Sequence, residues 1–168
     1  TGGANHGGDF SGGIDRVDLM VRSWGGYPRV DQAMTLLGDR YQQMPAGEIL
    51  PFGNGRSYGD SCLNSRGCVL SSARLDNFIE FDAQSGRICC EAGVTLAQII
   101  EVALPHGWFL PVTPGTKFVT VGGAIANDVH GKNHHVEGSF GCHVLRFELL
   151  RSDGSRLICS SSENTELY

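Results

Sequence analysis

The chain of 168 residues is long enough for one domain with a buried core, and its 40% hydrophobic and 18% charged residues are typical of globular proteins. A net charge of −5 without a basic stripe argues against a general nucleic-acid-binding protein. No apolar run approaches the roughly 20 residues of a membrane span, so we expect no transmembrane segment. The 24 glycines indicate tight turns and close backbone approaches, in which main-chain amides can touch a ligand.

The cysteines form no CxxC pair and no spacing typical of zinc sites. We therefore expect mostly buried, reduced thiols, although the sequence leaves one or two disulfides open. Reduced thiols favour a reducing compartment, and no signal peptide opens the chain, so we predict a soluble, cytoplasmic protein. The six cysteines are Cys62, Cys68, Cys89, Cys90, Cys142 and Cys159.

The first 13 residues, "TGGANHGGDFSGG", are rich in glycine and lack periodicity, which predicts a mobile tail in which His6 is solvated. The turn-rich stretch "SWGGYP" is expected to anchor the entry to the domain through Trp24 and Tyr27. We therefore divide the chain into a glycine-rich N-terminal segment with its anchor, residues 1–27, and one domain, residues 28–168.

Strands are predicted where short apolar runs end at turn residues. "GEILPF" ends a strand just before "GNGRSYGD", and "CVLSS" forms another. "NFIEFDAQSGRICCEAG" predicts a hairpin around a Ser-Gly turn, in which the adjacent Cys89 and Cys90 point to opposite faces. "HVLRFELLRSDGSRLICSS" predicts a second hairpin around Asp153 and Gly154.

Two helices are predicted between these hairpins. "TLAQIIEVALPHG" begins at the capping residue Thr95, has apolar residues at helical spacing and stops at Pro105-His106-Gly107, with His106 as the C-terminal cap partner. A short helix of small residues is expected from Gly122 to Asp128. Strands that alternate with so few helices predict an α+β domain of two small lobes.

The stretch "GGAIANDVHGKNHHVEGSFG" first suggests a metal site. His130 and His134 are spaced i, i+4, and His135 or Asp128 could add a third ligand. Gly131 lies between the two histidines, however, and the stretch lacks the HExxH pattern. We therefore predict no metal site.

A cofactor that carries phosphate accounts for more of the residues. In "GNGRSYGD", Gly53, Gly55 and Gly59 leave consecutive amides free of Cβ atoms, and Arg56 adds positive charge, so the loop could cradle a pyrophosphate. The loop lacks the GxGxxG-helix and GKS/T fingerprints that would name the ligand. The alternative is a loop whose glycines serve only its turns.

The helix that begins at Gly122 strengthens the cofactor interpretation. Its N-terminal end is expected to offer free amides and a partial positive charge, worth about 0.3 to 1 kcal/mol for an anion. His130 and Lys132 follow the helix and could supply donors or positive charge to a reduced redox cofactor. His134, His135 and His143 are predicted to pack or to form hydrogen bonds.

Four segments in order resemble a known family: "LPFGNGRSYGDSCLN", "EAGVTLAQII", "PVTPGTKFVTVGGAIANDVHGKNHHVEGSFG" and "LLRSDGS". They are similar to FAD-binding oxidoreductases of the vanillyl-alcohol oxidase and p-cresol methylhydroxylase superfamily, from about residue 46 onward. The resemblance implies an α+β, two-lobed FAD-binding domain of the p-cresol methylhydroxylase type, with FAD extended between the lobes. It also implies that the domain is incomplete at its C-terminus.

The resemblance assigns cofactor-binding residues motif by motif. Those of the first loop, which would wrap the pyrophosphate, are Pro51, Phe52, Gly53, Asn54, Gly55, Arg56, Ser57, Tyr58, Gly59, Asp60 and Ser61. Those that would line the rest of FAD are Gly115, Thr120, Val121, Gly122, Gly123, Asn127, Asp128, Val129 and His130. His130 and Lys132 match residues that border the flavin and are the predicted catalytic pair, for polarising the flavin or positioning the donor hydroxyl. Relatives with covalent FAD carry a histidine where this chain has Arg56, which implies non-covalent FAD.

The activity implied by the resemblance is oxidation of a sugar or alditol hydroxyl by hydride transfer to flavin N5. The family's substrate domain is not found in the 168 residues. We therefore expect a truncated fragment that by itself binds FAD weakly or not at all and is inactive, with the catalytic base in the other domain. The alternative is a non-catalytic module that binds a nucleotide or a partner and self-associates through an uncovered apolar surface. The resemblance also leaves association with the cell envelope open.

Overall fold

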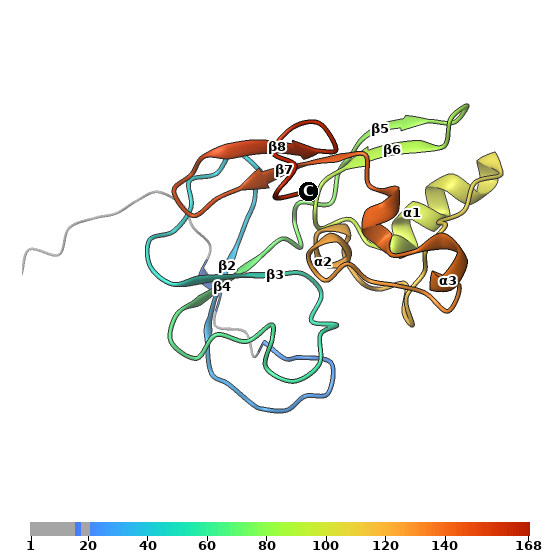
Figure 1. Cartoon of the computed structure of the whole chain (residues 1–168). Coiled ribbons are helices and arrows are strands. Elements are labelled where there is room, and N and C mark those ends of the chain that lie inside the picture. The colour runs from blue at the N-terminus through green and yellow to red at the C-terminus, as the bar shows by residue number, and fades with distance from the viewer. Residues whose placement is uncertain (1–15, 18–20) are drawn as a thin grey trace, which may run out of the picture.

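The computed structural model describes residues 16–17 and 21–168 and has two lobes (Figure 1). The first lobe contains a four-stranded sheet in the order β1-β2-β4-β3. β2 and β3 each pair with β4 in parallel, and β1 pairs with β2 antiparallel. The strands are β1 (Arg16–Val17), β2 (Ala33–Leu36), β3 (Ile49–Phe52) and β4 (Cys68–Ser71). The strands predicted from "GEILPF" and "CVLSS" are confirmed as β3 and β4.

Both faces of the first lobe's sheet are buried. Successive residues of β4 point in opposite directions, and each packs into a different hydrophobic cluster. Val69 is fully buried and packs with Val21 and Met34 on one face. Leu70 packs with Leu37 and Leu75 on the other. This lobe therefore has a core of its own.

The second lobe begins with the predicted hairpin, formed by β5 (Phe78–Asp82) and β6 (Arg87–Cys90). Gly86 in its turn has a φ of 71°, a conformation that favours glycine. Helix α1 (Leu96–Ala103) follows and is capped as predicted: the Thr95 side chain accepts from the Gln98 amide, and the Gln98 side chain accepts from the Thr95 amide. The 3-10 helix η1 (Leu104–His106) ends it at Gly107, and the His106 ring packs against Phe81.

The core of the second lobe joins α1 to the helix α2 (Val121–Ala126). Leu96 and Ile99 from α1 pack with Ala124 from α2 and with Phe140. Cys90 packs against this cluster whereas Cys89 is exposed, so the prediction that these neighbours face opposite sides is confirmed. Two further short helices, α3 (His134–Glu137) and η2 (Phe140–His143), complete the lobe.

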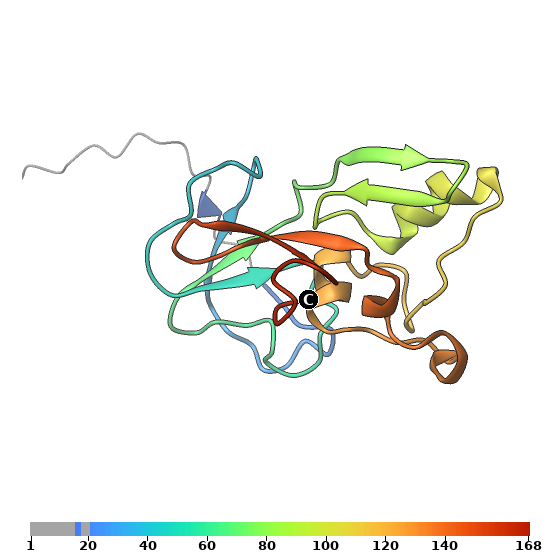
Figure 2. The ribbon, with the colours of Figure 1, turned by 45° about the horizontal axis from the view of Figure 1, so that its top comes forward.

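The second predicted hairpin is confirmed as β7 (Arg146–Leu150) and β8 (Arg156–Ser160). Figure 2 shows it running from the second lobe, beside α2, to the first. Its contact with the first lobe comes from Arg156, which donates to the Arg40 carbonyl and packs over the ring of Tyr41. The hairpin thus ties the two lobes together.

Two expectations about side chains are wrong. All six cysteines are free, but only Cys62 and Cys159 are buried, because several of the others lie on edge positions of small sheets and short helices. Trp24 and Tyr27 do not anchor the chain by burial, since they are 53% and 79% exposed. The anchor is a main-chain contact instead, from the Trp24 amide to the Ser57 carbonyl at 3.0 Å.

The predicted mobile tail with His6 lies outside the described residues, and the proposed boundary after Tyr27 stays a prediction. Within residues 16–17 and 21–168, no helix is both long and apolar enough to cross a bilayer.

Candidate functional site

The first glycine-rich loop, residues 53–61, follows β3, and its main-chain amides are unpaired among the residues that the structure describes. Within the described part of the chain, no acceptor lies in hydrogen-bonding range of any amide from residue 53 to residue 61. Gly55 and Gly59 have φ values of 61° and 60°, in the left-handed region that favours glycine, and the chain bends at residues 53–55 and turns at residues 59–62. Successive amides that face the same way form a concave site for an anion.

Gly55 is required for this shape. It is buried, and a Cβ there would lie 2.6 Å from the Arg22 carbonyl oxygen. Gly53 is equally confined, because its Cβ would lie 2.4 Å from Oγ1 of Thr120. The glycines therefore serve close packing as well as turns.

Arg56 in this loop has a buried side-chain nitrogen that lacks a hydrogen-bond partner in the described part of the chain. Its Nε is buried and meets no acceptor among the described residues, while its guanidinium lies 5.1 Å from the centre of the Trp24 ring. A buried cationic donor without a partner is costly, and an anion would relieve that cost. The loop and Arg56 together fit a pyrophosphate.

The second glycine-rich stretch behaves differently, and the prediction of free amides at its helix end is wrong. The Val121 and Gly122 amides donate to the Val94 and Ala92 carbonyls, each at 2.8 Å. The Gly123 amide donates to Oγ1 of Thr120, the N-cap residue. The connection from β6 to α1 and the N-cap residue Thr120 thus pair the donors that were predicted to be free for a ligand.

The structure brings the two stretches into direct contact. Besides the approach of Gly53 to Thr120, Nδ2 of Asn54 donates to the Phe118 carbonyl at 2.8 Å. A cavity of about 140 Å³ lies beside this contact, well below the roughly 300 Å³ of common ligand pockets. The cavity is therefore too small for an extended dinucleotide, whereas the amides of residues 53–61 remain without acceptors among the described residues. The cavity is lined by Gly53, Asn54, Ala73, Asp76, Gly93, Thr95, Gln98 and Thr120.

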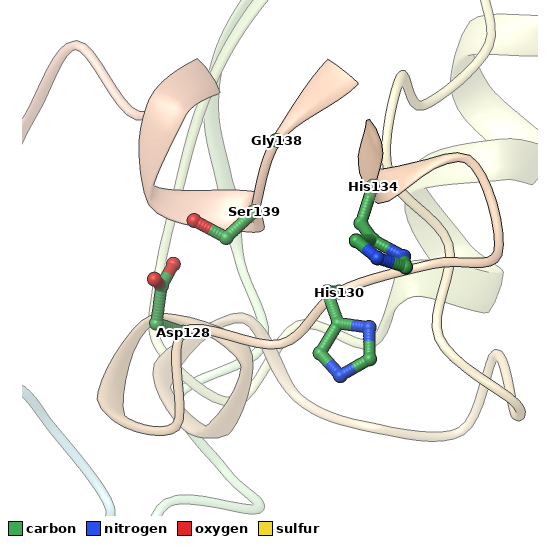
Figure 3. A pocket seen from close by; sticks show the side chains of 5 residues that line it. All are labelled: Asp128, His130, His134, Gly138 and Ser139. Carbon is green, nitrogen blue, oxygen red and sulfur yellow. The ribbon is translucent and has the colours of Figure 1, made fainter. Parts of the chain in front are cut away.

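A second hollow, of about 400 Å³, lies in the histidine-containing segment after α2. Its lining residues are Asp128, His130, His134, Gly138 and Ser139. Figure 3 shows the rings of His130 and His134 beside each other, and their centres are 5.3 Å apart in an edge-to-face arrangement. Among the described residues, no group of three or more His, Cys, Asp or Glu side chains could hold a metal ion.

Asp128 is turned away from these rings. Its carboxylate accepts hydrogen bonds from the Gly141 amide, at 2.9 Å, and from the Ser139 hydroxyl. Hydrogen bonds to the anion, first that of Ser139, lower the pKa of Asp128 below its usual range. The carboxylate thus already has a partner within the protein, and the role of Asp128 along the cofactor stays a prediction.

The other predicted residues of this stretch fall into two groups. Asn127 and Val129 serve the fold, since Nδ2 of Asn127 donates to the Gly123 carbonyl at 2.9 Å and Val129 packs against the core. Gly115, Lys132 and the ring of His130 are exposed and accessible to a ligand. The histidines predicted to form hydrogen bonds include His143, whose Nε2 lies 2.9 Å from the Glu137 carbonyl.

Sequence reasoning did not select Asp76 or Ser139 as site residues. Ser139 stands within a motif that carries the family resemblance, so a closer comparison of that motif could have found it. Asp76 has no such signal, because it reaches the cavity only through the packing of the lobes.

A model of the FAD binding domain family matches residues 44–160, which is more than half of the chain. The chain belongs to this FAD-binding family. It is 44% identical to decaprenylphosphoryl-beta-D-ribose oxidase of Mycolicibacterium smegmatis over 121 residues, 71% of this chain and 26% of that protein. It is 36% identical to D-lactate dehydrogenase of Archaeoglobus fulgidus over 96 residues, 57% and 21% of the two chains. The solved structure of aclacinomycin oxidoreductase matches 88% of this chain and 32% of its own, with a TM-score of 0.64 and 21% identity.

These matches confirm the resemblance to FAD-binding oxidoreductases, the two-lobed fold and FAD as the cofactor of this FAD-binding family member. The free amides of residues 53–61 and the unpartnered Nε of Arg56 fit the pyrophosphate of FAD. The chain spans about a quarter of the length of the ribose oxidase that it matches. Activity and substrate are therefore matters for proposal.

Proposed function

We propose that this chain is the FAD-binding part of an oxidoreductase that oxidises a sugar or alditol hydroxyl. The observation that carries the proposal is the run of unpaired amides from residue 53 to residue 61, joined by the buried Nε of Arg56. The names of two relatives, a ribose oxidase and a lactate dehydrogenase, support a donor that carries a hydroxyl group.

In this proposal, the pyrophosphate lies on the loop from Pro51 to Ser61, and the flavin end of FAD lies toward His130. FAD, when bound, supplies an acceptor for a hydride at N5 of its flavin. His130 and Lys132 polarise the flavin or position the donor hydroxyl, and their exposure leaves them accessible for either role. The cofactor is held without a covalent bond in this proposal, because Arg56, which offers no nucleophile, stands where relatives with covalent FAD carry a histidine.

The chain alone is proposed to turn over no alcohol. The base that accepts the hydroxyl proton is assigned to a part of the protein beyond these residues, since this stretch covers 26% of the ribose oxidase. The six free thiols support a reducing, cytoplasmic location.

Titration of the purified chain with FAD tests the proposal. The sequence predicted weak or absent binding by the chain alone, but the unpaired amides of residues 53–61 lead us to expect one FAD per chain, seen as a perturbed flavin absorbance. We also expect full release of the flavin upon acid denaturation, because the proposed site holds it without a covalent bond. Binding that is absent, or flavin that stays with the denatured protein, would contradict the proposal. An alditol oxidation activity of the chain alone would contradict only the claim of inactivity.

A non-catalytic module that associates with itself is the second candidate. It is favoured by large apolar side chains that are exposed, including Leu104, Phe109, Phe118, Val136 and Leu145. Sedimentation of the chain with and without FAD separates the two candidates. Dimers that form without FAD, in a protein that binds no FAD, would favour the module.

A further inference from the structure

The loop from Asp128 to Gly141 is closed by contacts between its two ends. The Phe140 amide donates to the Val129 carbonyl at 2.8 Å, and His130 forms a β-bridge with Ser139. The helix α3 (His134–Glu137) lies between these ends, so the closed loop brings the ring of His134 beside that of His130. The hollow of about 400 Å³ lies at this closure.

The side chain of Asp128 adds two contacts to the closure. Figure 3 shows its carboxylate turned toward Ser139 rather than toward the imidazoles. It accepts from the Gly141 amide at 2.9 Å and from the Ser139 hydroxyl, and the lowered pKa of Asp128 agrees with hydrogen bonds that favour the anion. The fit is tight, because a Cβ on Gly141 would lie 2.8 Å from Oδ1 of Asp128.

The backbone of Asp128 is also unusual. Its φ is 39°, in the left-handed region that residues other than glycine rarely adopt. Among the described residues only Asn164 shares this feature. A strained residue persists where its surroundings hold it, and here the surroundings are the donors of Ser139 and Gly141.

We propose that Asp128 is a positioning residue that fixes the ring of His130 through Ser139 and Gly141. The carboxylate holds the end of α2 against the start of η2, so that the strand partner of His130 cannot move away. His130 then packs edge-to-face on His134, with ring centres 5.3 Å apart. The statement that the His130 ring faces the flavin rests on the proposed function. The closure of the loop by Asp128 does not depend on it.

The test uses the full chain without cofactor and imidazole NMR spectra of its histidines. In Asp128→Ala, we expect loss of the NOE between the His130 and His134 rings, shifted resonances of both, and hydrogen exchange at the Gly141 amide that is about tenfold faster. Asp128→Asn should restore the wild-type pattern, because its Oδ1 still accepts from Gly141. The resonances of His106, which packs on Phe81 elsewhere in the lobe, should not move.

Asp153→Ala is the matched control. Asp153 also accepts from a nearby serine, Ser155, through both its amide and its hydroxyl, but it lies in the turn of the β7–β8 hairpin. Its replacement should leave His130 and His134 unchanged. If Asp128→Ala fails to fold, Ser139→Ala removes one donor only and should give smaller shifts at the same two rings.

An unchanged NOE and unchanged ring resonances in a folded Asp128→Ala or Ser139→Ala variant would overturn the proposal. Resonances in Asp128→Asn that match those of the alanine variant would overturn it as well. Neither outcome depends on FAD, so failure of this inference is distinct from failure of the proposed function.

Discussion

The two glycine-rich stretches look alike in sequence, but they use their amides in different ways. Residues 53–61 leave the main-chain donors without acceptors, whereas the first amides of α2 are taken by Ala92, Val94 and Thr120. Glycine in the first loop makes a shape that can receive an anion. Glycine in the second lets a helix approach the neighbouring backbone, since a Cβ on Gly122 would lie 3.0 Å from that of Ala92.

This difference shows that glycine content alone does not locate a phosphate site. A ligand can use only those donors that the protein has not already paired. Our proposal therefore places the pyrophosphate of FAD on the first stretch and gives the start of the second stretch a mainly structural role. Substitutions in the two stretches should have separable effects on FAD affinity and on stability.

The largest expected effect is that of Gly55→Ala. Alanine at a φ of 61°, with its Cβ 2.6 Å from a backbone oxygen, should reshape the loop. We expect FAD affinity to fall about 100-fold or more, which corresponds to about 2.7 kcal/mol. Isothermal titration measures it. Gly122→Ala is the matched control, and an affinity lost equally in both variants would contradict the distinction between the stretches.

Arg56→Gln should have the next largest effect. It removes a charge-assisted donor, worth about 1.5 to 3 kcal/mol, so FAD should bind about 10- to 100-fold more weakly with little change in thermal stability. The same titration at two salt concentrations measures the loss of FAD affinity and the part of it that is electrostatic. Arg87→Gln, on the exposed edge of β6, should bind FAD like the wild type. Equal losses in the two variants would show a general charge effect.

Thr120→Ala should affect stability more than binding. It removes the N-cap of α2, so the free energy of unfolding should decrease by about 1 kcal/mol. Urea denaturation measures this decrease, and Thr95→Ala at the cap of α1 provides the comparison. A stable Thr120→Ala protein that no longer binds FAD would place the second stretch in the cofactor site after all.

The smallest expected effect concerns pH. Hydrogen bonds lower the folded-state pKa of Asp128 below its unfolded value of about 3.9, so the unfolded chain binds more protons in that range. The stabilisation by this carboxylate is therefore present above about pH 4 and is lost as the pH falls through the folded-state pKa. Between pH 6 and pH 3, the free energy of unfolding from denaturation curves should decrease less steeply in Asp128→Asn than in the wild type. If the free energy of unfolding decreases equally steeply in both proteins, the Asp128 carboxylate does not contribute to stability in this way.

The sequence predicted the elements whose signals are local. Gly86 and Gly154 mark the turns of the two hairpins, and Thr95 with Gln98 marks the start of α1. In each case the contact that forms the turn or the cap joins residues that are close in the chain, so the local sequence is enough to predict it. The family motifs likewise identified the FAD-binding fold, because they lie in continuous segments of the sequence.

The tertiary structure decided which polar groups were left for a ligand. The Gly122 amide meets the Ala92 carbonyl, and Oδ1 of Asp128 meets the Gly141 amide, through contacts between segments that are distant in sequence. No local sequence pattern predicts such pairing, because a donor is free or occupied only once segments that are distant in the chain have packed together. For this protein the sequence determined where glycine opens the backbone, and packing determined that only the first opening keeps its amides unpaired.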